Sequence, residues 1–422
     1  MSVEKQLLVG TGRADITPPL GVQLRGGPPR IAERVLDPLY ATALVLSDGT
    51  QSVGLVSCET LNLPDTFVVE ATRAIEDRTG IAAGNMLLAA THTHCGPTLD
   101  DPYAKTLKMQ ICSCVAEACS GLQPCRVGAG AGTVEKVAVN QREMLPEGQT
   151  NRFGSVMNGD GYDQPVDREV GVVRFDDLEG SSIAALVNFA CHPDSSPQDD
   201  PTISAQYPGE LRRVIESATG ATTLFLQGCC GNTGMIGRWF QMARYEAAQA
   251  EAYDMTRRVG RRIAGQALQV FESIDTRART HHRARSKHHY DWVFEHLDIP
   301  AVTSFGAKSS RFTPPPFDHK RAEAPHSAEI RALVLNDIAF VGIPADTYCE
   351  IGMEIKKKSR ARHTLVLGHA NGCLAYIPVP NAYDEGGYSV AAAKSANIGP
   401  GTAQIVVNTA LDIVDQLMRA KT

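Results

Sequence analysis

Residues 87–100, LLAATHTHCGPTLD, form an apolar run that ends abruptly in His92, His94 and a Gly-Pro turn. The run has the length and composition of a buried strand, so both histidines stand where that strand ends. Side chains two positions apart on an extended chain point to the same side, and the two imidazoles would therefore face one pocket. This stretch alone leaves two interpretations open: a metal site, or two polar residues in a turn.

Four further apolar runs end in polar side chains in the same way. They are VNFACHP with His192, LFLQGCCGNTG with Asn232 and Thr233, IAFVGIPADTYCE with Asp346 and Glu350, and TLVLGHANGCLAY with His369, Asn371 and Tyr376. Loops at strand ends carry many of the functional groups of α/β proteins. A zinc site takes two or three imidazoles and a carboxylate, with one position open to water. Five such strand ends exceed what core packing requires, so the sequence favours a metal-dependent enzyme.

The order of the expected elements indicates an α/β fold with mixed β-sheets flanked by helices. Two dipeptides between paired apolar runs, Asp48-Gly49 and Asn336-Asp337, predict hairpins. The sequence shows no internal repeat and no linker, so we expect a single catalytic domain over residues 1–422. Helices are expected over 65–79, 103–120, 208–218, 235–272 and 401–420, and strands over 125–139, 168–176 and 183–190.

Residues 276–327 differ in composition from the rest of the chain. RARTHHRARSKHHYDW is basic and rich in histidine, and RFTPPPFDHKRAEAPH is rich in proline and charge. Because no carboxylate or cysteine completes a ligand set around the two His-His pairs, we interpret the segment as a solvated loop rather than a metal site. It is expected to be a long excursion from the domain or a cap over the functional site.

Composition excludes several classes of function. The chain has 422 residues and a net charge of −6, which predicts no basic surface for nucleic acid or an anionic membrane. No apolar stretch approaches the roughly 18 residues of a membrane span, and the first residues lack the pattern of a signal peptide. We therefore expect a cytoplasmic protein whose eleven cysteines pack as small core residues. The oligomeric state is left open, and a homo-oligomer is compatible with the sequence.

Five motifs resemble, in order, the catalytic domain of the neutral/alkaline ceramidase family. They are GRADITPPLG, LLAATHTHCGPT, VNFACHP, LFLQGCCGN and GHANGCLAYIP followed by YDEGGY. The resemblance is closer to short bacterial relatives that lack the ceramidase C-terminal domain. It covers about residues 8–275 and 328–418. It implies the neutral ceramidase catalytic-domain fold and one Zn²⁺ per chain.

The resemblance also implies four zinc ligands. The first histidine of HTH is His92, and the histidine of the NFxxHP stretch is His192. A carboxylate after a strand-Pro turn and a tyrosine in the late segment complete the set at Asp346 and Tyr376. The family usually has glutamate where this chain has Asp346, so Glu350, one helical turn further on, is the alternative ligand.

The chain departs from the family at the positions of the ceramidase serine chemistry. In the loop aligned with the family's GDVSPN, the serine position is Gly234 and the aspartate position is Asn232. The serine of HTHSGP is Cys95, and an acidic residue of the SADYPG segment is Gln206. The serine mechanism therefore does not transfer to this chain.

We expect zinc-activated water to be the nucleophile instead. Zinc lowers the pKa of bound water from 15.7 to roughly 7 and polarises a carbonyl. Thr233 and the thiols of Cys95 and Cys230 are weaker candidates, because they are expected to pack as small residues.

Several side chains are expected to assist that water. His94 lies near the reacting carbonyl in the family and would act as an acid or stabilise the transition state. Glu350 and Asp194 are further candidates for a general base. Asn232, in the Gly-rich loop 228–234, would help to bind an oxyanion. Arg142 resembles in position a family arginine that lines the pocket, and would bind a substrate carboxylate or carbonyl unless it forms only a surface salt bridge.

The leading hypothesis is a zinc-dependent hydrolase that cleaves a C–N amide bond, or an ester bond, in a small or polar substrate. Ceramide itself is not favoured, because the serine is absent. Two alternatives stay open: a zinc-dependent lyase or isomerase of a small hydroxylated molecule, and a non-catalytic relative that binds a ligand. The metal is also open, since mixed nitrogen and oxygen ligands select weakly among divalent ions.

Overall fold

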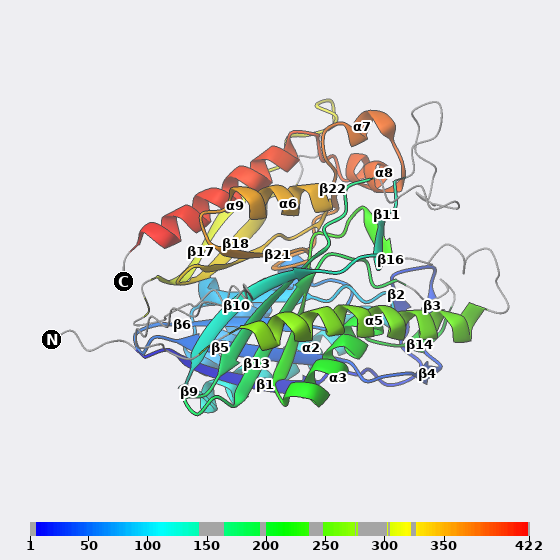
Figure 1. Cartoon of the computed structure of the whole chain (residues 1–422). Coiled ribbons are helices and arrows are strands. Elements are labelled where there is room, and N and C mark those ends of the chain that lie inside the picture. Colours follow the sequence, from blue (N-terminus) through cyan, green and yellow to red (C-terminus); the bar gives the residue numbers. More distant parts are fainter. Residues whose placement is uncertain are drawn as a thin grey trace, which may run out of the picture.

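The computed structural model of the chain describes residues 6–142, 164–194, 200–235, 248–274, 276, 302, 304–321 and 326–420. These residues form an α/β fold of mixed sheets flanked by helices, as the sequence predicts (Figure 1). The first large sheet contains β7 (Met86–Ala90), β6 (Ser52–Cys58), β5 (Tyr40–Ser47), β1 (Leu8–Asp15) and β9 (Gln123–Pro124) in this order. The second contains β10 (Arg126–Thr133), β12 (Glu169–Asp176), β13 (Ser182–Phe189) and β15 (Thr222–Gln227). The third contains β17 (Phe305–Phe312), β18 (Ala328–Leu335), β19 (Ile338–Gly342) and β21 (His363–Leu367).

The same four-strand unit occurs in each of these large sheets. Two successive strand pairs are antiparallel and the last pair is parallel, namely β6 with β7, β13 with β15, and β19 with β21. A parallel pair needs a crossover connection, and here it contains a helix each time: α1 (Asp65–Thr79), α3 (Gln206–Thr219) and α6 (Cys349–Lys358). The sequence shows no internal repeat, because this architecture depends on the hydrophobic pattern rather than on residue identity.

Each sheet has helices on its outer face and shares its inner face with the other sheets. Helices α1 and α2 (Asp101–Ser120) pack on the first sheet, α3 and α5 (Ala248–Ser273) on the second, and α6 and α9 (Thr402–Arg419) on the third. Figure 1 shows α6 and α9 above the third sheet and α5 along the second. One apolar cluster joins the inner faces, with residues such as Leu46, Phe175, Leu226 and Phe340.

Short elements surround one end of the sheets. They are β2 (Gln23–Arg25), β3 (Arg30–Ile31), β4 (Arg34–Val35), β8 (Gly96–Pro97), β11 (Ala138–Asn140), β14 (Thr202–Ile203), β16 (Thr233–Met235), β20 (Asp346–Thr347), β22 (Tyr376–Ile377), α7 (Ala382–Glu385) and α8 (Tyr388–Ser395). The short helix η1 (Ala83–Asn85) lies at the opposite end, where the Asn85 side-chain amide donates to the Ser52 carbonyl at the start of β6.

Local sequence signals account for many element boundaries. Both predicted hairpins are confirmed, because β5 pairs with β6 and β18 pairs with β19 in antiparallel register. Helix α1 begins after Pro64 and ends at Gly80, whose φ of 77° is left-handed and suits glycine. Helix α2 begins at Asp100, whose carboxylate accepts a hydrogen bond from the Tyr103 amide. Helix α5 is confirmed from residue 248 onward, and its expected start at 235–247 lies mostly outside the described residues.

One prediction was wrong for part of the 276–327 excursion. Residues 305–312 are not a solvated loop, because they form β17, which pairs along its whole length with β18. The composition misled the prediction, since Lys308 and Arg311 of β17 are exposed, while Phe305 and Phe312 are buried. An edge strand can carry such charges without leaving the sheet. The two His-His pairs lie outside the described residues.

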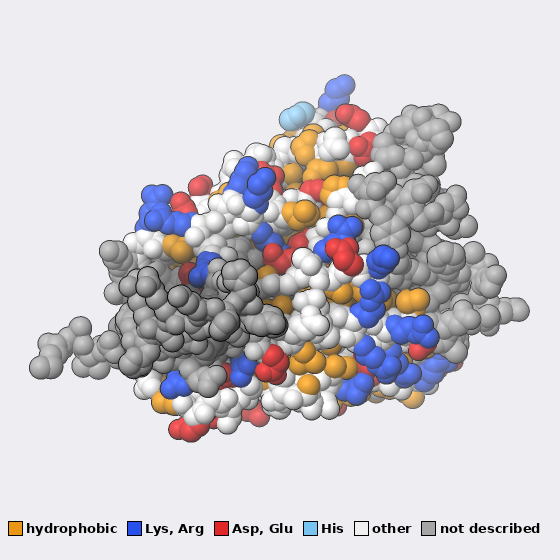
Figure 2. Space-filling model, viewed as in Figure 1, with side chains coloured by type: hydrophobic (Ala, Val, Ile, Leu, Met, Phe, Trp, Pro, Cys, Tyr) orange, Lys and Arg blue, Asp and Glu red, His pale blue; other side chains and the backbone are white. Residues whose placement is uncertain are grey.

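The surface carries charges of both signs. Figure 2 shows lysine and arginine side chains interspersed with aspartate and glutamate on the face in view. None of the helices in the described part of the chain is long and apolar enough to cross a membrane. Most of the cysteines are buried as expected, among them Cys112 and Cys114 on α2.

Candidate metal centre

The carboxyl ends of strands from all three large sheets meet at one place. His92 follows β7, His192 follows β13, Asp346 follows β19 and His369 follows β21. Backbone hydrogen bonds join these ends: the Ala90 amide donates to the His369 carbonyl at 3.1 Å, and the Gly368 amide to the Gln227 carbonyl at 3.0 Å. The repeated strand order therefore brings together side chains that are far apart in sequence.

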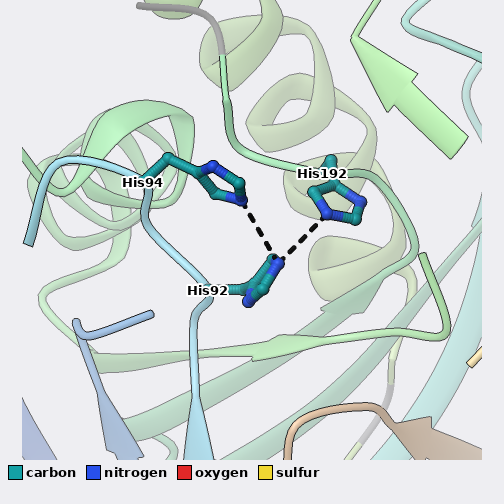
Figure 3. A group of neighbouring side chains, drawn as sticks. All are labelled: His92, His94 and His192. Atoms are coloured by element: carbon teal, nitrogen blue, oxygen red, sulfur yellow. Dashed lines mark hydrogen bonds between the residues drawn. The ribbon is translucent and has the colours of Figure 1, made fainter. Parts of the chain in front are cut away.

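Three imidazoles converge at this point (Figure 3). The Nε2 atom of His92 lies 3.1 Å from Nε2 of His192 and 3.3 Å from Nε2 of His94. His92 and His192 are buried, whereas His94 is half-buried. Burial first, and then the neighbouring imidazoles, lower the pKa of His92 well below its ordinary value. The His92 ring is therefore neutral and able to act as a ligand.

Backbone carbonyls fix the tautomer of all three rings. Nδ1–H of His92 donates to the Leu61 carbonyl at 2.7 Å, that of His94 to Gly26 at 2.8 Å, and that of His192 to Cys230 at 2.8 Å. A carbonyl only accepts, so Nδ1 carries a proton in each ring and Nε2 is left as the atom that can bind a metal. Nε2 of His92 lies 3.1 and 3.3 Å from the other two Nε2 atoms, and lone pairs at this spacing are stabilised by a cation or a shared proton between them.

Asp346 adds a buried carboxylate to the cluster. Its Oδ2 lies 3.4 Å from Nε2 of His192 and 3.9 Å from Nε2 of His92. Burial alone would raise the pKa of Asp346, but His192 and His369 lower it below its ordinary value. Tyr376 pairs with Asp346 in the β20–β22 ladder, and their side chains are hydrogen-bonded. All four expected zinc ligands, His92, His192, Asp346 and Tyr376, thus lie together.

The sequence reasoning did not predict two further side chains of the cluster, His369 and Cys230, as metal donors. His369 Nε2 lies 3.4 Å from Oδ1 of Asp346, and its ring stacks on His92 with centroids 3.7 Å apart. The Cys230 thiol belongs to a second metal-capable group with His192 and Asp346. His369 ends one of the five apolar runs, so its position was a usable signal. Cys230 carried no such signal, because it looks like a small residue in a Gly-rich loop.

Glu350 and Asn232 contact each other rather than the histidines. The Asn232 amide donates to Oε2 of Glu350 at 2.7 Å, and its Oδ1 accepts a hydrogen bond from the Cys349 amide at 2.9 Å. Among the described residues, the metal-capable groups contain Asp346 and not Glu350. The Asn232 side chain thus ties the Gly-rich loop to the first turn of α6.

Arg142 is buried in an ion pair instead of lying on the surface. Its guanidinium contacts Oε2 of Glu385 at 2.7 Å, the Tyr348 hydroxyl at 2.8 Å and the Gly386 carbonyl at 2.9 Å. These contacts join the end of β11 to the loop that connects α7 and α8. The guanidinium thereby positions the segment that follows Tyr376.

The space beside the family's serine position is filled by a side chain that follows β11. A Cβ atom added to Gly234 would lie 2.2 Å from Nε2 of Gln141, which is buried and has no hydrogen-bond partner among the described residues. Thr233 is buried, and its hydroxyl donates to the Ala190 carbonyl at 3.3 Å. Gln206 accepts a hydrogen bond from the His94 amide at 3.0 Å, so it orients the HTH turn.

The thiols near the site are buried. Cys95 and Cys230 are both 0% exposed. Burial first, and then Asp346, raise the pKa of Cys230 well above its ordinary value. A thiol in this environment is a poor nucleophile, because the thiolate is the reactive form.

These features define a mixed α/β protein with buried histidine and aspartate groups that can hold a metal ion. The fold is that of bacterial neutral ceramidase: the enzyme from Pseudomonas aeruginosa superposes with a TM-score of 0.76 and 16% identity, over 98% of this chain and 75% of that chain. A ceramidase in complex with C2 superposes with a TM-score of 0.74 and 16% identity, over 98% and 76% of the two chains.

Parts of the sequence are similar to neutral ceramidases. Neutral ceramidases A and B of Dictyostelium discoideum are both 25% identical to this chain, over 249 and 185 residues. These alignments cover 53% and 40% of this chain, and about a third and a quarter of the relatives' lengths (34% and 25%). No protein-family profile matches the chain.

Proposed function

We propose that the protein is a zinc-dependent hydrolase of an amide bond, or an ester bond, with His92, His192, Asp346 and Tyr376 as metal ligands. The observation that carries the proposal is the convergence of Nε2 lone pairs, each fixed by a carbonyl on Nδ1. Similarity to ceramidases supports hydrolysis of a carbon–nitrogen bond as the reaction class.

The donor atoms fit a zinc ion. Zn–N bonds of about 2.0–2.1 Å separate two nitrogens on a tetrahedral ion by roughly 3.3 Å, and Nε2 of His92 and His192 lie 3.1 Å apart. Carbonyl groups on the opposite ring nitrogens are the usual support of histidine ligands. A buried carboxylate would balance part of the positive charge.

When bound, zinc would polarise the scissile carbonyl and make water a nucleophile near neutral pH. His94 is the candidate to take up a proton on Nε2 and return it as the acid, because it is half-buried and its Nε2 faces the same point as the ligands. Gly26 and Gln206 hold it from both sides, through Nδ1 and the backbone amide. The Asn232 side-chain amide already donates a hydrogen bond to Glu350. We therefore add the Gln141 side-chain amide as a candidate donor to the oxyanion.

The proposed substrate is a small or polar amide rather than ceramide. Gly234 lacks the hydroxyl of the family's serine position, and Gln141 fills the space beside it. Water therefore takes the place of a covalent nucleophile. An amide side chain also offers hydrogen bonds to a polar group of the substrate.

The test is a panel of N-acyl amines and esters incubated with zinc-loaded protein, with release of amine or acid measured. We expect turnover that a chelator abolishes and added zinc restores. His192→Ala should lose both the bound zinc and the turnover. His319→Ala is the matched control, because His319 is exposed and outside the cluster; it should keep both. Full zinc content in His192→Ala would contradict the proposed ligand set.

The same panel separates the two alternatives. A lyase or isomerase would convert hydroxylated molecules that contain no hydrolysable bond. A non-catalytic relative would be stabilised by a ligand in thermal unfolding and show no turnover after zinc is restored.

A further inference from the structure

A second set of donor atoms lies beside the proposed zinc ligands. Sγ of Cys230 lies 4.0 Å from Oδ1 of Asp346 and 4.0 Å from Nε2 of His369, and the last two atoms are 3.4 Å apart. All three residues are buried. The proposed function uses neither Cys230 nor His369. A thiol, a carboxylate and an imidazole in one buried triangle are the donors typical of a zinc site.

The two oxygens of Asp346 face different neighbours. Oδ2 faces His192 and His92, at 3.4 and 3.9 Å from their Nε2 atoms. Oδ1 faces His369 and Cys230, at 3.4 and 4.0 Å. A carboxylate with neighbours on both oxygens can bridge two ions, and the two sets of donors adjoin each other: the ligand atoms of His369 and His92, and those of Cys230 and His192, lie within 4.8 Å of each other.

The orientation of the His369 ring does not suit binding to the same ion as His92. Two imidazoles on one tetrahedral zinc, with bonds of about 2.0–2.1 Å, radiate from the ion and place their centroids roughly 5 Å apart. The rings of His92 and His192, the two proposed histidine ligands of the first ion, obey this, with centroids 4.7 Å apart and an interplanar angle of 77°. His369 instead stacks on His92 at 3.7 Å and 13°. Parallel rings at this spacing suit two ions side by side, which in two-metal sites lie about 3.5–4 Å apart.

We propose that the centre holds a second divalent ion, bound by Cys230, Asp346 and His369, with Asp346 bridging it to the first. The proposal rests on the proposed function for the first ion. The thiolate and imidazole ligands select zinc or a similar ion over magnesium and calcium, which prefer oxygen. Thiol coordination displaces the proton of Cys230 to solvent as the metal–sulfur bond forms.

A second ion would explain why this chain has aspartate at position 346, where the family usually has glutamate. Asp346 stands where the family usually has glutamate, and the shorter side chain lies between both groups of donors. Gly231 permits this approach, because a Cβ there would lie 2.6 Å from the Asp346 carbonyl oxygen. A larger residue would push the Cys230 loop away from Asp346.

The experiment counts zinc per chain in protein loaded with excess ZnCl₂ and then desalted. We expect two zinc ions in the wild type and in His319→Ala, and one in His369→Ala. Cys230→Ser serves as a second variant of nearly unchanged shape, and should hold one tightly bound ion. Circular dichroism on each variant checks that the fold persists.

X-ray absorption at the zinc edge provides an independent readout. We expect a Zn–S distance of about 2.3 Å in the wild type that disappears in Cys230→Ser, and a zinc–zinc distance of about 3.5–4 Å. One zinc per chain without a sulfur ligand would overturn the second site and leave the proposed function intact. No zinc in the wild type would overturn both.

Discussion

At the residue scale, the site contains left-handed backbone conformations that residues other than glycine rarely adopt. His92 has a φ of 68°, His369 of 52° and Asn371 of 61°. Such conformations cost about 1–3 kcal/mol each and persist where the surrounding structure enforces them. Here the enforcing contacts include the Asn371 side chain, whose Oδ1 accepts a hydrogen bond from the Leu88 amide at 2.8 Å. The turns after β7 and β21 therefore aim His92 and His369 at the centre.

Gly231→Ala tests this close packing. The added Cβ would lie 2.6 Å from the backbone oxygen of Asp346, so the backbone must shift and move the carboxylate. We expect zinc affinity to fall by about 10–100-fold, as for other changes in the support of metal ligands. Competition with a zinc chelator measures the affinity. Gly84→Ala is the control, because a Cβ there meets nothing within 4 Å; equal losses in both variants would refute the argument.

At the element scale, α5 contains two glycines with opposite environments. A Cβ on Gly265 meets nothing within 4 Å, whereas a Cβ on Gly260 would lie 2.9 Å from the Tyr207 carbonyl oxygen and 2.9 Å from Cβ of Glu210 on α3. Gly260 thus lets α5 approach α3 closely, while Gly265 costs helical stability without a packing benefit. The contrast shows why a glycine in a helix cannot be interpreted from the sequence alone.

The pair of substitutions has opposite expected effects on the free energy of unfolding. Gly265→Ala should raise it by about 0.5–1 kcal/mol, because alanine loses less conformational entropy in a helix. Gly260→Ala should lower it by about 1–3 kcal/mol, as expected for overpacking. Urea denaturation followed by circular dichroism measures both. A stabilising Gly260→Ala would mean that α5 and α3 pack less tightly than described.

At the scale of the whole molecule, the three large sheets share one apolar core. Phe340, Leu226 and Leu46 come from different sheets and belong to the same cluster. Without the other two sheets, the inner hydrophobic face of each sheet would be exposed to water. We therefore propose that the chain unfolds as one unit, as a single domain would.

Phe340→Ala tests this cooperativity. Loss of the buried ring should lower the free energy of unfolding by about 3–5 kcal/mol, and calorimetry should still record one transition. A second, unaffected transition at the wild-type temperature would show that one sheet unfolds independently. Val69→Ala on the outer surface of α1, where the side chain is 48% exposed, is the control and should change little.

Much of the fold was predictable because its signals are local. The hairpins at Asp48-Gly49 and Asn336-Asp337 and the limits of α1 depend on turn residues and on neighbouring apolar runs. The strand β17 was not predictable, because its charged residues resemble a loop until β18 is placed beside it. The repeated four-strand unit was not predictable either, because its three copies share a strand order and not an amino-acid sequence.

The candidate site likewise has features that the sequence predicts and features that only the folded chain reveals. That His92, His192, Asp346 and Tyr376 end apolar runs is readable in the sequence, since the distribution of apolar residues along a strand is a property of the chain. The folded structure was needed to see that Asp346 rather than Glu350 faces the imidazoles, and that Asn232 and Arg142 hold neighbouring segments. It was also needed to see that Cys230 and His369 lie in the cluster. A metal centre requires donor atoms about 3–4 Å apart, and for donors on different strands that distance arises only when the ends of separate sheets converge.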